Sequence, residues 1–143
     1  MKNLKRSFLL LSIILCGNVA LFSQTETKDL IDIQCEACLD SIENQSTQGM
    51  VECERKALAA WDKELNKYYN LLMGISDKSE KAKFKTAQKN WLTYKKSERD
   101  FYETAYYNEQ GTIYQLFAAG RETELTKTRV VELKSYYDVL TYD

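Results

Sequence analysis

The sequence predicts an all-α fold, an up-down-up bundle of three long helices with a disulfide-tied N-terminal leader. Apolar residues recur at spacings of three and four over three long segments, which is the period of an amphipathic helix. The chain has no proline and only five glycines, so few residues interrupt long helices. No segment shows the convincing alternation of apolar and polar residues that predicts a strand.

The first 23 residues are typical of a secretory signal peptide. Lys2, Lys5 and Arg6 form a positive start, residues 8–15 are almost entirely apolar, and Ser23 precedes the expected cleavage point. The apolar stretch is shorter than the roughly 20 residues of a transmembrane helix, which disfavours an uncleaved anchor. We therefore expect an exported protein, periplasmic or secreted, with no membrane association after cleavage.

Cys16 raises the alternative of a lipoprotein. Lipidation usually requires a small residue directly before the cysteine, and this chain has Leu15 there. We therefore do not expect a lipid anchor.

The charge of the chain is divided unevenly. Residues 1–23 hold three of the 20 basic residues and no acidic residue, which leaves 17 basic and 21 acidic residues in 24–143. This acidic balance argues against a nucleic-acid partner and is compatible with a basic protein partner. The chain has no histidine, which excludes imidazole-based catalysis.

Residues 24–46 form the leader, which holds two of the three cysteines that follow the signal peptide. We expect residues 24–33 to be loosely ordered or a short helical lead-in. In an oxidising compartment cysteines are expected to pair. We favour a Cys38–Cys53 bridge, which ties the leader to the first long helix and is worth roughly 3 kcal/mol. Cys35 is then free or intermolecular.

Two other functions of the cysteines are disfavoured. Cys35 and Cys38 have the C-x-x-C spacing of redox enzymes, but such motifs normally accompany a βαβ pattern, which is missing here. A structural zinc site needs a fourth ligand, and neither histidine nor a fourth cysteine is available after the signal peptide. We expect no metal and no cofactor.

The first long helix is expected over residues 48–75. Ser46 or Thr47 can cap its start, and Gly74 marks its end. Residues at helical spacing give it one apolar face: Met50, Cys53, Ala57, Trp61, Leu65, Tyr68 and Leu72.

The second helix is expected over residues 79–106, after a capping box formed by Asp77 and Glu80. Gln88 and Glu98 lie on or beside its apolar face. The charged runs 78–85 and 89–99 indicate a solvated side. The predicted apolar face consists of Phe84, Ala87, Trp91, Tyr94, Phe101 and Ala105.

The third helix is expected over residues 112–140, following the turn at 108–111. Arg129 lies in the middle of its apolar stripe, and Gly120 is expected to loosen it locally. Short connections predict that neighbouring helices pack antiparallel. The stripe consists of Ile113, Leu116, Phe117, Leu125, Leu133, Tyr136 and Leu140.

Several polar and aromatic residues lie on or beside these faces. We interpret them as a structural network between packed helices, in which Arg129 bonds Asp62 or Glu98 and Gln88 bridges. The functional alternative is a polar pocket or a partner-binding patch. The set consists of Asp62, Asn66, Tyr69, Gln88, Trp91, Tyr94 and Arg129.

The turn before the third helix is the candidate partner-binding loop. Tyr106, Tyr107 and Glu109 place aromatic and acidic side chains at a helix–helix turn, a composition common at protein interfaces. For catalysis, by contrast, no pair of carboxylates stands out, and no nucleophile elbow or P-loop is present. We expect a protein that is not an enzyme.

The order and spacing of these motifs resemble the lysozyme inhibitor LprI-like family of small exported bacterial domains. The resemblance implies that residues 47–143 form an LprI-like helical domain. It covers the chain from Cys38 to Leu133. The motifs are Cys38, 47–50, Cys53, 61–69, 87–94, 111–112, 125–129 and Leu133.

The chain departs from the family pattern in three places. Lys95 stands where the family often has arginine. Both cysteines of a second family bridge are absent together, near 98–99 and 121–122, and Cys35 is an addition. The favoured Cys38–Cys53 bridge matches the family positions.

The resemblance implies binding to lysozyme and inhibition by stoichiometric occlusion of this muramidase, without catalysis. The alternative is an envelope-associated binding or structural domain with an unknown ligand and no inhibitory activity.

Overall fold

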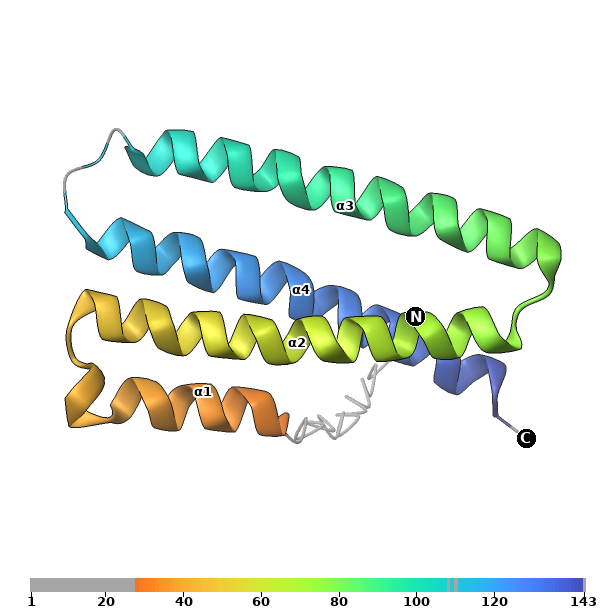
Figure 1. The fold of residues 1–143 in the computed structure, drawn as a ribbon, viewed down its shortest axis with the longest axis horizontal. Helices are drawn as coiled ribbons and strands as arrows, with labels where there is room; N and C mark the ends of the chain where they lie inside the picture. Colours follow the sequence, from red (N-terminus) through yellow and green to blue (C-terminus); the bar gives the residue numbers. More distant parts are fainter. Residues whose placement is uncertain (1–27, 108, 110, 143) are drawn as a thin grey trace, which may run out of the picture.

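The computed structural model describes residues 28–107, 109 and 111–142, and the predicted signal peptide, Cys16 and Ser23 lie outside this part of the chain. The described elements are all helical, which confirms the all-α prediction (Figure 1). The prediction of three long helices misses one further helix, which forms within the leader. The elements are α1 (Leu30–Asp40), the short 3₁₀ helix η1 (Ile42–Asn44), α2 (Thr47–Ile75), α3 (Lys78–Tyr107) and α4 (Ile113–Leu140).

Helix α1 is short and depends on its neighbours. Asp29 caps it, because its carboxylate accepts a hydrogen bond from the Ile31 backbone N–H at 2.8 Å. Its half-buried side, which includes Cys38, packs against α2. Isolated helices of about this length are marginal in water, so docking on α2 and the disulfide supply the stability that the local sequence lacks. Because α1 depends on contacts with residues far along the chain, the local sequence of the leader does not predict a helix over these residues.

Helix α2 begins and ends as the sequence predicts. The Ser46 hydroxyl accepts a hydrogen bond from the Gly49 N–H at 3.0 Å, and the Ser76 hydroxyl donates to the Leu72 carbonyl at 2.7 Å. Gly49 must be small, since a Cβ there would lie 2.8 Å from the Asn44 Cα of η1. The predicted apolar face is confirmed, since Cys53, Ala57, Trp61, Leu65 and Leu72 are buried and Met50 and Tyr68 are half-buried. Val51, which was not predicted, is buried as well.

Helix α3 starts at the predicted capping box. The Asp77 N–H donates to the Glu80 carboxylate and the Glu80 N–H donates to the Asp77 carboxylate, both at 2.8 Å. The predicted apolar face is wrong in four positions, because Ala87, Tyr94, Phe101 and Ala105 are exposed. The side that packs against the rest of the molecule, mainly against α4, is rotated from it and consists of Phe84, Gln88, Trp91, Lys95, Arg99, Tyr102 and Tyr106.

Helix α4 continues unbroken through Gly120, so the expected local loosening is not observed. Its middle is buried as predicted, but both ends of the predicted stripe are exposed, including Tyr136 and Leu140. Near the C-terminal end Tyr137 packs instead, with its ring 6.3 Å from that of Tyr68. The buried residues of α4 are Thr123, Leu125, Thr126, Arg129, Val130 and Leu133.

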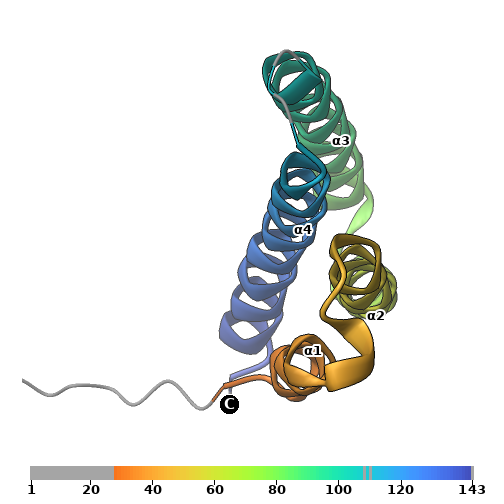
Figure 2. The same ribbon diagram turned by 90° about the vertical axis from the view of Figure 1, so that its left-hand side faces the viewer.

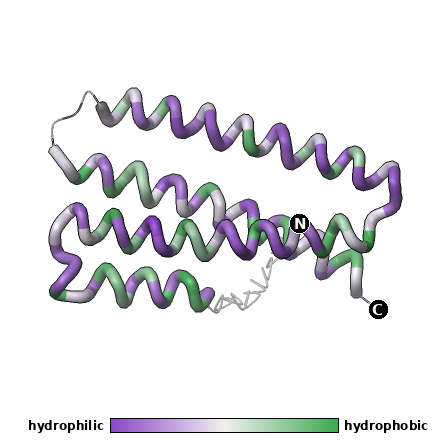
Figure 3. The backbone as a smooth tube through the Cα atoms, viewed as in Figure 1, coloured by the Kyte–Doolittle hydropathy of each residue, from purple (hydrophilic) through white to green (hydrophobic). Residues whose placement is uncertain are grey.

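The four helices form an open arrangement in which α4 lies between α2 and α3 (Figure 2). Helix α3 runs antiparallel to α4 as predicted, but the main partner of α2 is α4, with which it runs parallel (Figure 1). The apolar core joins Trp61, Leu65 and Leu72 of α2 to Val130 and Leu133 of α4. Helix α3, by contrast, is hydrophilic along most of its length (Figure 3). None of the described helices combines the length and apolarity of a transmembrane span.

Candidate functional site

The contact between α3 and α4 is formed by charged and polar side chains, which we call the polar seam. Along α3 the spacing of three or four residues puts its members on one side of the helix. Successive turns of α3 therefore place a side chain opposite a polar partner on α4: Gln88 opposite Arg129, and Lys95 and Arg99 opposite Glu122. The polar seam consists of Gln88, Trp91, Lys95, Arg99, Glu122, Thr126 and Arg129.

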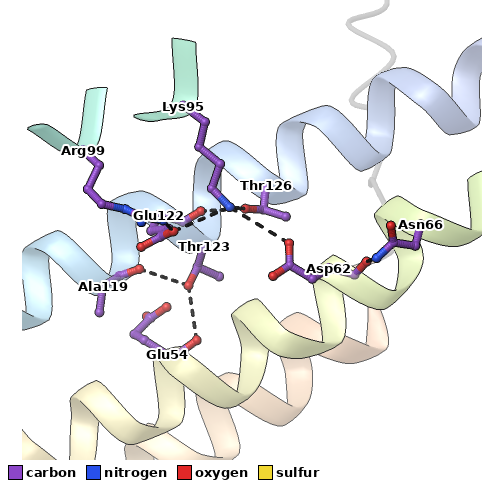
Figure 4. Close-up of polar contacts among 9 residues, drawn as sticks. All are labelled: Glu54, Asp62, Asn66, Lys95, Arg99, Ala119, Glu122, Thr123 and Thr126. Carbon is purple, nitrogen blue, oxygen red and sulfur yellow. Dashed lines mark hydrogen bonds and ion pairs between the residues drawn. The ribbon is translucent and has the colours of Figure 1, made fainter. Parts of the chain in front are cut away.

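Lys95 joins three helices at the centre of the polar seam (Figure 4). Its ammonium donates to the Thr126 hydroxyl at 2.8 Å and lies 3.6 Å from a Glu122 carboxylate oxygen of α4. It also lies 4.0 Å from the Asp62 carboxylate of α2. Burial lowers the pKa of Lys95, while the Asp62 carboxylate acts in the opposite direction. Arg99 makes a second ion pair with Glu122, so one carboxylate serves two cations.

Arg129 is buried in the same seam, where Gln88 bridges to it as expected but its carboxylate partner differs from those predicted. Its Nε donates to the Gln88 side-chain oxygen at 3.1 Å, and its Nη1 donates to the Glu132 carboxylate at 2.9 Å. Its guanidinium lies 5.9 Å from the Trp91 ring centre, within range of a cation–π contact. The predicted bonds to Asp62 or Glu98 are wrong.

The two carboxylates predicted for Arg129 are engaged elsewhere. Asp62 faces Lys95, and Glu98 pairs with Arg121 at 3.2 Å. Which carboxylate meets which cation depends on the rotation of α3 about its axis, which the sequence predicted differently.

The remaining residues of the predicted polar set are separate from the seam. Asn66 is exposed, and its amide donates to the Asp62 backbone carbonyl at 2.8 Å within α2. The Tyr69 ring stacks on Phe84 with centres 5.1 Å apart. Tyr94 is exposed. The structure therefore brings together Asp62, Gln88, Trp91 and Arg129, but not Asn66, Tyr69 or Tyr94.

Sequence reasoning missed Lys95 and Arg99 as members of the seam. Both fall in the charged run 89–99, which was expected to be solvated. A signal was available, since Trp91, Lys95 and Arg99 follow one another at intervals of four residues. A lysine in register with a half-buried tryptophan indicates an interfacial position.

The cysteines pair as favoured. Cys38 and Cys53 form a disulfide with their Cα atoms 5.7 Å apart. Cys35 is the free cysteine among the described residues, half-buried, with its thiol 3.9 Å from the Cys53 carbonyl. Burial, together with the carboxylates of Glu54 and Asp32, raises the pKa of Cys35 to about 11. Within the described ranges no three cysteine or carboxylate side chains are grouped as a metal site.

Two turns lie at the same end of the molecule, η1 with the α1–α2 turn on one side and the α3–α4 turn on the other, and the starts of α2 and α4 lie between them (Figure 1). The Thr112 hydroxyl donates to the Thr47 hydroxyl at 3.1 Å and links them. Tyr106 lies at the centre of an aromatic cluster there. Its ring centre is 6.1 Å from that of Tyr102, 5.7 Å from that of Tyr114 and 6.4 Å from that of Phe117.

Large apolar side chains are exposed at this end, and we call them the turn-end surface: Ile42 (91% exposed), Phe101 (71%), Phe117 (51%) and Ile113 (39%). Of the predicted loop residues, Glu109 is exposed and Tyr106 is half-buried, while the side chain of Tyr107 lies outside the described part. Exposed large apolar groups at one end of a molecule are candidates for an interaction surface. Here Phe101 and Phe117, which sequence reasoning had assigned to buried faces, supply them.

The comparisons with known proteins give a structural relative and a family. The crystal structure of an uncharacterised protein from Burkholderia thailandensis is similar, with a TM-score of 0.72 and 25% sequence identity over 78% of this chain. The matched region covers 55% of that protein, so this chain spans about half its length. No curated protein matches. The family model described as lysozyme inhibitor LprI matches residues 38–133. Since this match covers well over half of the sequence, the chain belongs to the lysozyme inhibitor LprI family.

Proposed function

We propose that this protein binds a lysozyme and inhibits it by covering the enzyme's cleft, without catalysing a reaction. Membership of the lysozyme inhibitor LprI family supports this function. The structural observation that carries it is the turn-end surface, which exposes two phenylalanines and two isoleucines at one end of a narrow molecule. Aromatic anchors of this kind supply much of the affinity at protein interfaces. Because lysozyme is a basic enzyme, the acidic balance of residues 24–143 favours the encounter.

The protein acts outside the cytoplasm in this proposal. Residues 1–23 serve as a signal peptide cleaved after Ser23, residues 24–46 as the leader, and residues 47–143 as the inhibitor domain. The Cys38–Cys53 disulfide supports this location, because disulfides persist in oxidising compartments such as the periplasm.

The polar seam has a structural role in this proposal. Each of its buried cations has an acceptor: Lys95 has Thr126 and Glu122, and Arg129 has Gln88 and Glu132. Satisfied polar contacts of this kind fix the register of two helices. The seam therefore sets the position of α3 along α4, and with it the position of Phe101 in the turn-end surface.

A lysis-rate titration tests the proposal. The exported and processed protein, with its disulfide intact, is titrated against lysozymes of different types acting on a cell-wall suspension. The expected result is saturating inhibition of one type at a stoichiometry near one to one. A folded protein that inhibits no lysozyme would contradict the proposal and leave an envelope binding or structural domain as the better description.

The turn-end surface is tested with matched variants. Replacing Phe101 and Phe117 by serine is expected to raise the inhibition constant at least tenfold, as loss of aromatic anchors does. Leu92→Ser is the control, because Leu92 is 54% exposed on the same helix but lies outside the turn-end surface. Replacing Tyr106 and Tyr107 by serine then tests the loop itself. Equal inhibition by all of these variants would place the binding surface elsewhere.

A further inference from the structure

A largely apolar groove lies beside the turn-end surface, where α1, α2 and α4 approach one another. It has a volume of about 570 Å³. It is continuous with the turn-end surface, since Phe117 belongs to both. Its uncharged lining consists of Leu39 of α1, Met50 of α2, Tyr106 of α3, and Leu116, Phe117 and Gly120 of α4.

The groove carries two carboxylates without a cation. Glu54 and Glu124 both line it, and no lysine or arginine nitrogen of the described residues lies within ion-pair distance of either. Arg121 also lines the groove, but its guanidinium is engaged by Glu98 at 3.2 Å. The charge of the groove is therefore negative.

The neighbouring hollow shares Leu39, Glu54, Gly120 and Glu124 with the groove and also holds Lys28 and Lys127. Both lysines pair with other acids, Lys127 with Asp32 at 2.9 Å and Lys28 with Glu36. Among the described residues, Glu54 and Glu124 are thus left without an ion pair.

Gly120 keeps the Glu54 carboxylate open to the groove. A Cβ at this position would lie 3.7 Å from Glu54 Oε1, in ordinary contact with it. Any larger side chain at position 120 would stand in the groove beside the carboxylate. The glycine in the middle of α4 therefore leaves room that an incoming side chain can use.

We infer that this groove binds an arginine side chain of the basic protein partner. Apolar walls suit the methylene stem of an arginine, and two carboxylates suit its guanidinium, which donates in a planar fork. The inference rests on the proposed function, because the lysozyme supplies the arginine. The inference places an arginine-binding groove next to the exposed phenylalanines of the turn-end surface. Arginine and aromatic side chains are the residues that often dominate binding at the centre of an interface.

The first test compares affinities for a lysozyme that the protein inhibits. The double variant E54Q/E124Q keeps the shape of both side chains, and we expect it to raise the Kd about tenfold and to weaken the salt dependence of binding. Asp138→Asn is the control, since Asp138 is an exposed acid near the other end of α4 and outside the groove. Its Kd is expected to stay within about twofold of the wild-type value. Equal affinities of wild type and E54Q/E124Q would overturn the inference while the proposed function stands.

The second test needs no lysozyme. Nα-acetylarginine amide is titrated into the protein while the amide NMR resonances are followed, with the uncharged isostere Nα-acetylcitrulline amide at matched ionic strength as control. We expect the arginine compound, but not the citrulline compound, to shift the Gly120 resonance, and E54Q/E124Q to abolish the shift. A Gly120 resonance that does not respond selectively would overturn the inference. A selective shift in a protein that inhibits no lysozyme would support the groove and contradict the proposed function.

Discussion

Helices α2 and α3 have nearly the same length, 29 and 30 residues, but very different surroundings. Six side chains of α2 are buried, because it lies against both α1 and α4. On α3 only Tyr102 is buried within the described residues, because α4 is its main neighbour. The difference shows that the number of neighbouring helices, rather than helix length or amphipathicity, decides how much of a helix becomes core.

The two regions are also held by different interactions. Trp61, Leu65 and Leu133 stabilise the α2–α4 contact through burial of apolar surface, roughly 1.5–3 kcal/mol for each fully buried side chain. The polar seam of α3 relies on hydrogen bonds and ion pairs, which contribute about 1 kcal/mol each because water competes for the same groups. We therefore expect α3 to open more readily than the α1–α2–α4 part.

The largest expected effect comes from a truncation in the packed part. Leu133→Ala is expected to lower the free energy of unfolding by about 4 kcal/mol, since the side chain is fully buried and its removal leaves a cavity. The matched change on α3, Phe101→Ala, is expected to cost about 0.5 kcal/mol or less because this ring is 71% exposed. Urea denaturation followed by circular dichroism measures both. Similar losses in the two variants would mean that α3 is packed as tightly as α4.

The disulfide belongs to the packed part, and its removal is the next largest effect. Replacing Cys38 and Cys53 by serine is expected to lower stability by about 3 kcal/mol, the entropy of closing a loop of 15 residues. Cys35→Ser, which breaks no covalent bond, is the control and is expected to change stability little. The same urea titration checks both. An unchanged midpoint in the double variant would show that α1 contributes nothing to the stability of α2.

The third change acts on the polar seam. Arg129→Ala leaves the Gln88 amide oxygen without its donor and removes the cation from the Trp91 ring, for a loss of about 2 kcal/mol. Hydrogen exchange is expected to speed up more in α3 than in α2. Arg55→Ala is the control, because its pair with Glu52 is exposed and such pairs are worth little. If the variant keeps its stability but no longer binds a lysozyme, Arg129 has a role in binding and not a structural one.

What the sequence predicted well was local. The ends of α2, α3 and α4 fall within one residue of the expected limits, because caps such as Ser46 and the Asp77–Glu80 pair act over three residues. The apolar face of α2 was predictable because two helices cover it and the stripe is wide.

What the sequence predicted poorly depends on contacts far along the chain. The buried side of α3 was misplaced because α4 is its main neighbour and α2 touches it only at a few side chains, so its tyrosines and phenylalanines need not be core. Tyr94 and Phe101 are exposed while Lys95 lies in the seam. The predicted carboxylate partners of Arg129 were wrong for the same reason, although the bridge to Gln88 is observed. The groove beside Gly120 was not predictable, since it forms only where α1, α2 and α4 come together.

The smallest expected effect concerns Cys35, and it tests whether α1 is docked. Burial together with the Glu54 and Asp32 carboxylates raises the pKa of this thiol from 9.0 to about 11. Alkylation by iodoacetamide at pH 8 is therefore expected to be at least tenfold slower in the folded than in the unfolded protein, because less thiolate is present. Mass spectrometry after labelling identifies Cys35 as the modified residue. Glu54→Gln is expected to move the pH midpoint of the reaction downwards, since it removes one of the charges that raise the pKa.

The raised pKa of Cys35 also determines how the stability of the folded protein changes with pH. Between pH 9.0 and about 11 the unfolded chain has lost the Cys35 proton while the folded chain keeps it, so the folded state binds more protons. The stability that this group contributes is present below pH 9.0 and is lost as the pH rises through this range. Subtracting the pH profile of Cys35→Ser isolates the contribution. A midpoint of alkylation near 9.0 in the folded protein would mean that α1, which carries Cys35, is not docked on α2 closely enough to bury the thiol. Only α2 and α4 would then count as tightly packed, and both outer helices, α1 and α3, would be expected to open readily.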